Sequence, residues 1–199
     1  MTTNISKSRG RPRRFDPDAA VPIAQHLFHA RGYDAVSVAD VTEALGINPP
    51  SFYAAFGSKA GLYARVLDNW AQTGAIPLAA ILRPDRPVAE ALVEVLQEAA
   101  RRYAIDPAGG CLVLEGTRCN DTEARDSALA CNIAAEAVIR DYIAARYPQA
   151  AERVTDYVST VMSGLSAKAR NGHDREQLLA TARMAGAVIE QALSDGVAI

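Results

Sequence analysis

The sequence has few of the features that build disulfide frameworks or membrane spans. Its three cysteines, an odd number at irregular spacing, fit a reduced cytoplasmic protein better than a disulfide-bonded one. Its apolar runs are only a few residues long, so we expect no membrane span. The opening residues, MTTNISKSRGRPRR, lack the apolar block of a signal peptide. We therefore predict a cytoplasmic protein that does not enter the membrane.

Motifs of the common catalytic classes are also missing. No G-x-S-x-G nucleophile elbow, phosphate-binding P-loop or H-E-x-x-H zinc motif occurs, so we expect no enzyme activity and no cofactor. Cys111, Cys119 and Cys131, with a distant His173, match no standard zinc spacing, and we predict no metal site. Cys111, within CLVL, is more typical of a buried small apolar residue. The alternatives that use these cysteines are a metal or thiol-redox sensor and a thiol-dependent enzyme.

Charge is divided unevenly along the chain. The formal net charge is −2, but residues 1–70 carry eight basic and six acidic side chains, whereas residues 71–199 carry thirteen and seventeen. A basic leading third followed by an acidic remainder is typical of a DNA-reading head attached to a body with another role.

The most basic stretch is residues 1–14, which hold five Lys or Arg side chains and no acid. This stretch has no apolar periodicity, so we predict a flexible basic arm. Because a residue before proline is biased toward extended backbone, Arg11, Arg13 and Arg14 would project from a thin segment that fits a DNA minor groove. The alternative is a solvated tail. If the arm reads DNA, its deletion should weaken specific binding strongly.

The stretch SVADVTEALGINPPSFYAAFGSK predicts two short helices joined at a tight corner. Apolar residues at helical spacing predict a helix over residues 38–45, and Gly46 follows it where a left-handed residue ends a helix. Asn48 then offers an N-cap side chain, and Pro49 suits the first helical position. Such a pair, here at about 38–57, is typical of a helix-turn-helix, whose second helix enters a DNA major groove.

Helices are predicted on both sides of this corner. One begins at Pro17 and ends at Gly32, and a long one covers about residues 58–74. His26 and His29 lie on the first of these helices. Because no Cys or acidic residue nearby completes a metal site, we expect both to be partly exposed surface histidines.

Three motifs carry a family resemblance: AQHLFHARGY, SVADVTEALGI, and SFYAAFGSK with the Leu62-Tyr63 that follows. In these motifs, residues 14–70 resemble the N-terminal DNA-binding domain of TetR (tetracycline-repressor) family regulators. The resemblance implies an all-α fold, with a three-helix homeodomain-like helix-turn-helix domain at residues 15–74. A helical effector-binding and dimerisation domain would follow at residues 75–199. One departure is Ala55, where the family often has histidine, so we do not expect the DNA sequence preferred by relatives.

The second half of the chain supports a helical body. Helices are predicted over residues 87–104, 122–147, 149–170 and 174–194, while residues 111–114 could be a strand or a buried helical turn. The last two helices are rich in small residues, which allow close helix packing. We predict that they form a homodimer interface, with packing inside one chain as the alternative.

The residues that we expect at the DNA are Arg11, Arg13, Arg14, Ser37, Asn48, Pro49, Pro50, Ser51, Tyr53 and Lys59. Lys59 stands at a helix N-terminus, where a cation is unfavourable unless a phosphate lies there too. The recognition surface has no Arg, Lys or Gln to form bidentate contacts with bases. The arm and the shape of the DNA should therefore carry a large share of the specificity.

Together these features predict a dimeric, ligand-responsive, sequence-specific transcriptional regulator, more specifically a repressor that a small-molecule effector releases from a palindromic operator. The alternative from another class is an interaction protein that keeps the helix-turn-helix shape without using it. We expect a small, partly hydrophobic organic effector. The candidate effector-binding residues are Trp70, Tyr103, Cys111, Leu112 and Met162.

Overall fold

The computed structural model describes residues 15–105 and 108–194, and every regular element among them is a helix, which confirms the predicted all-α class. The arm residues Arg11, Arg13 and Arg14 lie outside the described residues. None of the described helices is long and apolar enough to span a membrane. The elements are α1 (Pro17–Arg31), α2 (Val38–Leu45), α3 (Pro49–Phe56), α4 (Lys59–Thr73), α5 (Leu78–Ile81), α6 (Val88–Tyr103), α7 (Leu112–Gly116), α8 (Thr122–Ala144), α9 (Ala151–Arg170) and α10 (Arg175–Ser194).

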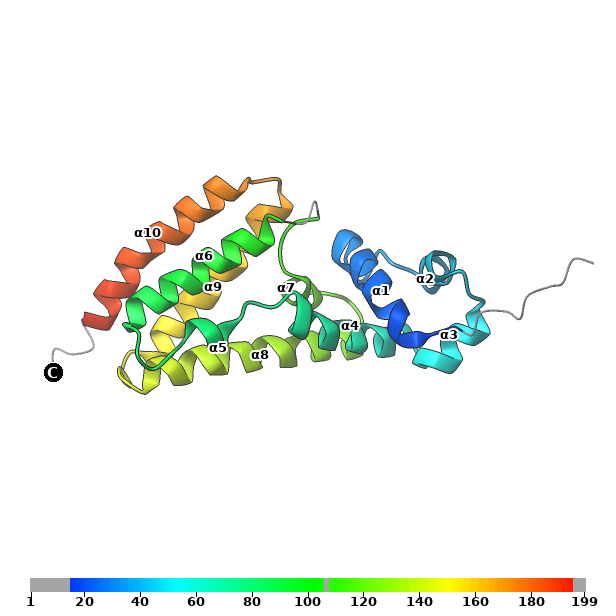
Figure 1. The fold of residues 1–199 in the computed structure, drawn as a ribbon, viewed down its shortest axis with the longest axis horizontal. Helices are drawn as coiled ribbons and strands as arrows, with labels where there is room; N and C mark the ends of the chain where they lie inside the picture. The colour runs from blue at the N-terminus through cyan, green and yellow to red at the C-terminus, as the bar shows by residue number, and fades with distance from the viewer. Residues whose placement is uncertain (1–14, 106–107, 195–199) are drawn as a thin grey trace, which may run out of the picture.

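The molecule is elongated, with a head and a body at opposite ends (Figure 1). Helices α1, α2 and α3 form the head, and α6, α9 and α10 pack together in the body. Helix α4 packs against both α1 and α8. Through α4 and α8, the head is therefore joined to the body by two long helices.

Side-chain caps fix the helix starts that the sequence predicts. Asp16 Oδ1 accepts from the backbone N–H of Asp18, and Ser58 Oγ accepts from that of Gly61 at 2.8 Å. Asp174 likewise accepts from Gln177 N at 2.9 Å at the start of α10. Such caps satisfy N–H groups that have no partner inside the helix, so these starts are encoded locally.

The body differs from the predicted element pattern in two places, and it decides one alternative that the sequence left open. The run at 111–114, which could be a strand or a helical turn, leads into the short helix α7, with Cys111 just before its first residue. Helix α8 ends at Ala144, before the predicted end at Tyr147, and Arg146 donates its backbone N–H to Ile143, three residues back, in a closing turn before Pro148. The four-residue helix α5 was not predicted from the sequence.

Two apolar clusters form the interior. The body cluster is built mainly from α6, α8, α9 and α10. The head cluster contains Phe28, Phe52 and Tyr63, and it also takes Leu112 from α7 and Ala128 from α8. The core of the head therefore crosses the predicted boundary near residue 74, which lets movements of α7 and α8 reach the head.

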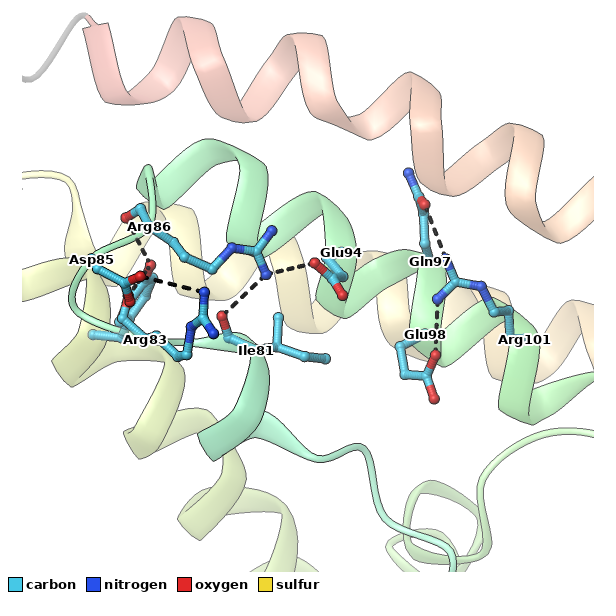
Figure 2. Close-up of polar contacts among 9 residues, drawn as sticks. Ile81, Arg83, Asp85, Arg86, Glu94, Gln97, Glu98 and Arg101 are labelled. Atoms are coloured by element: carbon cyan, nitrogen blue, oxygen red, sulfur yellow. Dashed lines mark hydrogen bonds and ion pairs between the residues drawn. The ribbon is translucent and has the colours of Figure 1, made fainter.

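Ion pairs fasten the turn between α5 and α6 (Figure 2). Arg86 donates to Glu94 and to the backbone carbonyl of Ile81 at 3.4 Å, and Arg83 pairs with Asp85 at 3.3 Å. These contacts hold α5 against α6. They also position the segment before α5, which borders the cavity described below.

Candidate functional site

The corner between α2 and α3 has the geometry of a helix-turn-helix. Gly46 adopts φ 64° and ψ 33°, a left-handed conformation that favours glycine, and its N–H donates to the carbonyl of Glu43 at 3.1 Å. Ile47 N donates to Thr42 O at 3.0 Å, and Asn48 Oδ1 accepts from Ser51 N at 2.9 Å. These bonds fix the angle at which α3 leaves α2.

Helix α3 has one face in the core and one in solvent. Phe52 is fully buried and Phe56 is 7% exposed, so both anchor the helix. On the outer face, Tyr53 is 52% exposed, and Pro49 and Pro50 are exposed beside it. Ser51 is half-buried. The α3 residues predicted to lie at the DNA thus share a surface that a DNA groove can reach.

Ser37 is engaged in capping α2. Its hydroxyl accepts from Asp40 N at 3.1 Å and donates to the Asp40 carboxylate, which also accepts from Ser37 N at 2.7 Å. Arg31 pairs with the same carboxylate at 2.8 Å. The hydrogen bonds from Ser37 and Arg31 hold the pKa of Asp40 well below its usual range. Ser37 is therefore first of all a structural residue, and its predicted phosphate contact stays a prediction.

Lys59 holds the loop between α1 and α2 against the start of α4. Its Nζ donates to the backbone carbonyls of Val36 at 2.9 Å and Tyr33 at 3.1 Å, and it lies 4.0 Å from the centroid of the Tyr33 ring. Two carbonyl dipoles and a π-face thus offset the cation at the positive end of the helix. A phosphate is not needed to explain Lys59, and its role in DNA contact remains a prediction.

Two polar contacts connect the loop between α1 and α2 to the corner between α7 and α8. The buried Tyr33 donates its hydroxyl to Asp121 Oδ2 at 2.9 Å, and the carboxylate of Asp34 accepts from the backbone and side chain of Asn120 at 3.0–3.1 Å. Burial and the Asp121 carboxylate raise the pKa of Tyr33 above its ordinary value. We call these four residues the head–body clamp.

His29 differs from the expectation of a surface histidine, since it is 4% exposed. Its Nε2 donates to Gly110 O at 3.1 Å, and its ring centroid lies 5.0 Å from that of Trp70. Arg170 also donates to the His29 carbonyl at 3.0 Å. The partners at 110 and 170 are far away in the sequence, so no local pattern signals this burial.

A cavity of about 220 Å³ lies in the body beside α4. Four of the five predicted effector-binding residues line it: Trp70, Tyr103, Cys111 and Met162. Leu112 does not, because its side chain is 1% exposed within the head cluster, where its carbonyl also accepts from the Tyr63 hydroxyl at 3.3 Å. Sequence reasoning missed the polar wall residues Asn132 and Glu136, which show no motif and are recognisable only once α8 is placed.

The cysteines give the sensing alternative no support. Burial raises the pKa of the Cys111, Cys119 and Cys131 thiols, which lowers the population of the reactive thiolate. Among the described residues, no group of three His, Cys, Asp or Glu side chains could hold a metal ion.

Comparisons with known proteins agree with this geometry. The sequence pattern of "Bacterial regulatory proteins, tetR family" matches residues 23–66. The chain is 61% identical to the HTH-type transcriptional repressor BdcR of Escherichia coli (strain K12), over 98% of this chain and 100% of BdcR. The chain belongs to the TetR family. It is therefore a DNA-binding transcriptional regulator, as its helix-turn-helix predicts.

More distant relatives match over most of their length. The repressor ComR of Escherichia coli (strain K12) is 28% identical over 89% of this chain and 90% of its own length. A cysteine variant of the TetR family regulator CifR, solved in complex with 26-base-pair operator DNA, is 32% identical with a TM-score of 0.76. That match covers 92% of this chain and 98% of the CifR chain. Head and body are therefore arranged here as in that regulator.

Proposed function

We propose that this chain is a homodimeric repressor that leaves its operator when a small molecule fills the cavity beside Trp70. The single observation that carries the proposal is the position of α4. This helix begins with Lys59 next to the recognition helix, and its last turn places Trp70 in the cavity wall. One rigid element thus touches both the DNA-binding head and the candidate ligand site.

The operator complex of CifR and the repressor function of BdcR support operator binding by this chain. We assign DNA contact to the outer face of α3, with Tyr53 at its centre, and the positioning of that face to Ser37, Asn48 and Lys59. A dimer would set its two recognition helices into successive major grooves, about 34–36 Å apart. Such a protein acts in the cytoplasm, where it meets the DNA.

The surfaces of α9 and α10 support dimerisation. Met184 and Val188 of α10 are 77% and 48% exposed, which is unusual for large apolar side chains. On α9, Gly164 is exposed, and a Cβ added there would meet nothing within 4 Å. An apolar face with small residues beside it suits close packing against the same helices of a second copy.

Effector binding would reach the head along two routes. The first is α4, whose Trp70 lies between the cavity and His29 of α1. The second is α8, which lines the cavity through Asn132 and Glu136 and begins next to the head–body clamp. A ligand that shifts either helix would change the spacing of the recognition helices, at a coupling free energy of about 1–3 kcal/mol.

Binding to the DNA that flanks the protein's own gene tests the proposal. We expect a mobility shift with the wild-type protein, and an affinity at least about tenfold lower for Tyr53→Ala, as for the loss of one good contact. Equal binding by wild type and Tyr53→Ala would contradict the assignment of α3 as the DNA-contacting helix.

A further inference from the structure

The wall of the cavity beside Trp70 is largely apolar, and its one carboxylate and its one amide both come from α8. Among its lining residues, Glu136 of α8 is the one charged side chain, and no Lys, Arg or His is present. Asn132, one turn earlier on α8, also lines the cavity, as does Ser159 of α9, the helix that packs against α8. The cavity therefore carries a negative charge at a single edge.

The Glu136 carboxylate is oriented but not neutralised. Asn132 Nδ2 donates to Glu136 Oε1 at 3.0 Å, and no Lys or Arg of the described residues forms an ion pair with Glu136. A carboxylate offers about four acceptor positions, of which Asn132 uses one. The Ser159 hydroxyl donates to Asp156 O at 3.2 Å, so its own oxygen can still accept. This edge of the cavity thus offers acceptors to a ligand and no positive charge.

A ligand must match both the size and the charge of this space. A cavity of about 220 Å³ exceeds the roughly 150 Å³ of an engineered apolar cavity that binds benzene, so one ring with a short chain fits. An unneutralised carboxylate beside apolar walls repels anions and favours a charge-assisted hydrogen bond from a cation. We propose that the effector is a small, largely apolar amine whose ammonium group binds Glu136 while its apolar part packs against Trp70. This assignment rests on the proposed function, since it names the ligand class of the same cavity.

Trp70 is the single tryptophan of the chain, so its fluorescence reports binding in the cavity directly. Three probes of similar size separate charge from shape: phenethylamine, phenethyl alcohol and phenylacetate. We expect phenethylamine to bind about tenfold more tightly than the alcohol, as for one charge-assisted hydrogen bond, and phenylacetate to bind most weakly.

The variant Glu136→Gln removes the charge but keeps the size of the side chain and an oxygen that can accept from Asn132. It should lower the affinity for phenethylamine about tenfold and change that for the alcohol no more than about twofold. Glu176→Gln is the matched control, because Glu176 is exposed in the first turn of α10, away from the cavity lining. This control should bind all three probes as the wild type does.

The assignment is overturned if none of the probes changes Trp70 fluorescence, if the amine binds no better than the alcohol, or if Glu136→Gln weakens both equally. Operator binding, followed in the same samples, tests the proposed function separately. Selective amine binding with the operator still bound would support the ligand class and contradict effector-controlled release. Operator binding without any response to the probes would contradict the ligand class and leave the DNA-binding function in place.

Discussion

At the scale of single residues, two tyrosines of the head place their hydroxyl groups in opposite environments. Tyr33 is 4% exposed, and its hydroxyl donates to Asp121 at 2.9 Å. Tyr53 is 52% exposed, and its hydroxyl has no hydrogen-bond partner in the described part of the chain. The same substitution at each position therefore separates folding from DNA binding.

We expect Tyr33→Phe to lower the free energy of unfolding by about 1–2 kcal/mol, because it removes a part-buried hydrogen bond to a carboxylate. Tyr53→Phe should change stability by less than about 0.5 kcal/mol, as for an exposed site, but weaken operator binding. Urea unfolding and operator titration of both variants check the pair. The reverse pattern, with stability lost at Tyr53 and not at Tyr33, would contradict the structure.

Lys59 gives a second residue-scale prediction. Lys59→Met keeps much of the alkyl chain but loses the hydrogen bonds to the Tyr33 and Val36 carbonyls. We expect the free energy of unfolding to fall by about 1–2 kcal/mol and the salt dependence of operator binding to change little. If Lys59 instead acts mainly on a phosphate, the free energy of unfolding will not change. The slope of log affinity for the operator against log salt concentration will then fall in magnitude by about one.

At the scale of elements, the capping box of α2 makes the head sensitive to acid. Because the pKa of Asp40 is lowered in the folded protein, this carboxylate stabilises the fold above its ordinary pKa of about 4. That contribution is lost as the pH falls toward the lowered value. Asp40→Asn should be less stable at pH 7 and lose less stability between about pH 4 and 2. Circular dichroism during acid titration checks this, and identical titration curves would contradict it.

The elements also show what the sequence can predict. Caps such as Ser37, Asn48 and Ser58 act on their own next turn, so the boundaries of the head helices follow from local residues. The burial of His29 depends on partners far away in the sequence, such as Gly110, whose carbonyl accepts its hydrogen bond. The composition of the cavity likewise depends on residues from distant parts of the sequence. Local periodicity therefore predicted the head helices in detail and the body helices approximately. It could not show that Cys111 lines the cavity and that Leu112 does not.

At the scale of the whole molecule, we expect a dimer built on α9 and α10. Met184→Glu places a charge on the exposed face of α10 and should give a folded monomer that binds the operator weakly. Ile133→Glu is the matched control, since Ile133 is a 61% exposed apolar residue of α8 outside the proposed interface. Size-exclusion chromatography with light scattering measures the mass of each variant and so distinguishes a dimer from a monomer. A dimeric Met184→Glu, or a monomeric Ile133→Glu, would contradict the assignment of the interface.

The central claim is that two heads of one dimer bind a palindromic operator. Footprinting on the DNA that flanks the protein's own gene, repeated over a salt titration, tests it most directly. We expect one protected site with two half-sites about one helical turn apart, and an affinity that falls steeply as salt rises. The absence of a protected site, or protection that does not respond to salt, would contradict it.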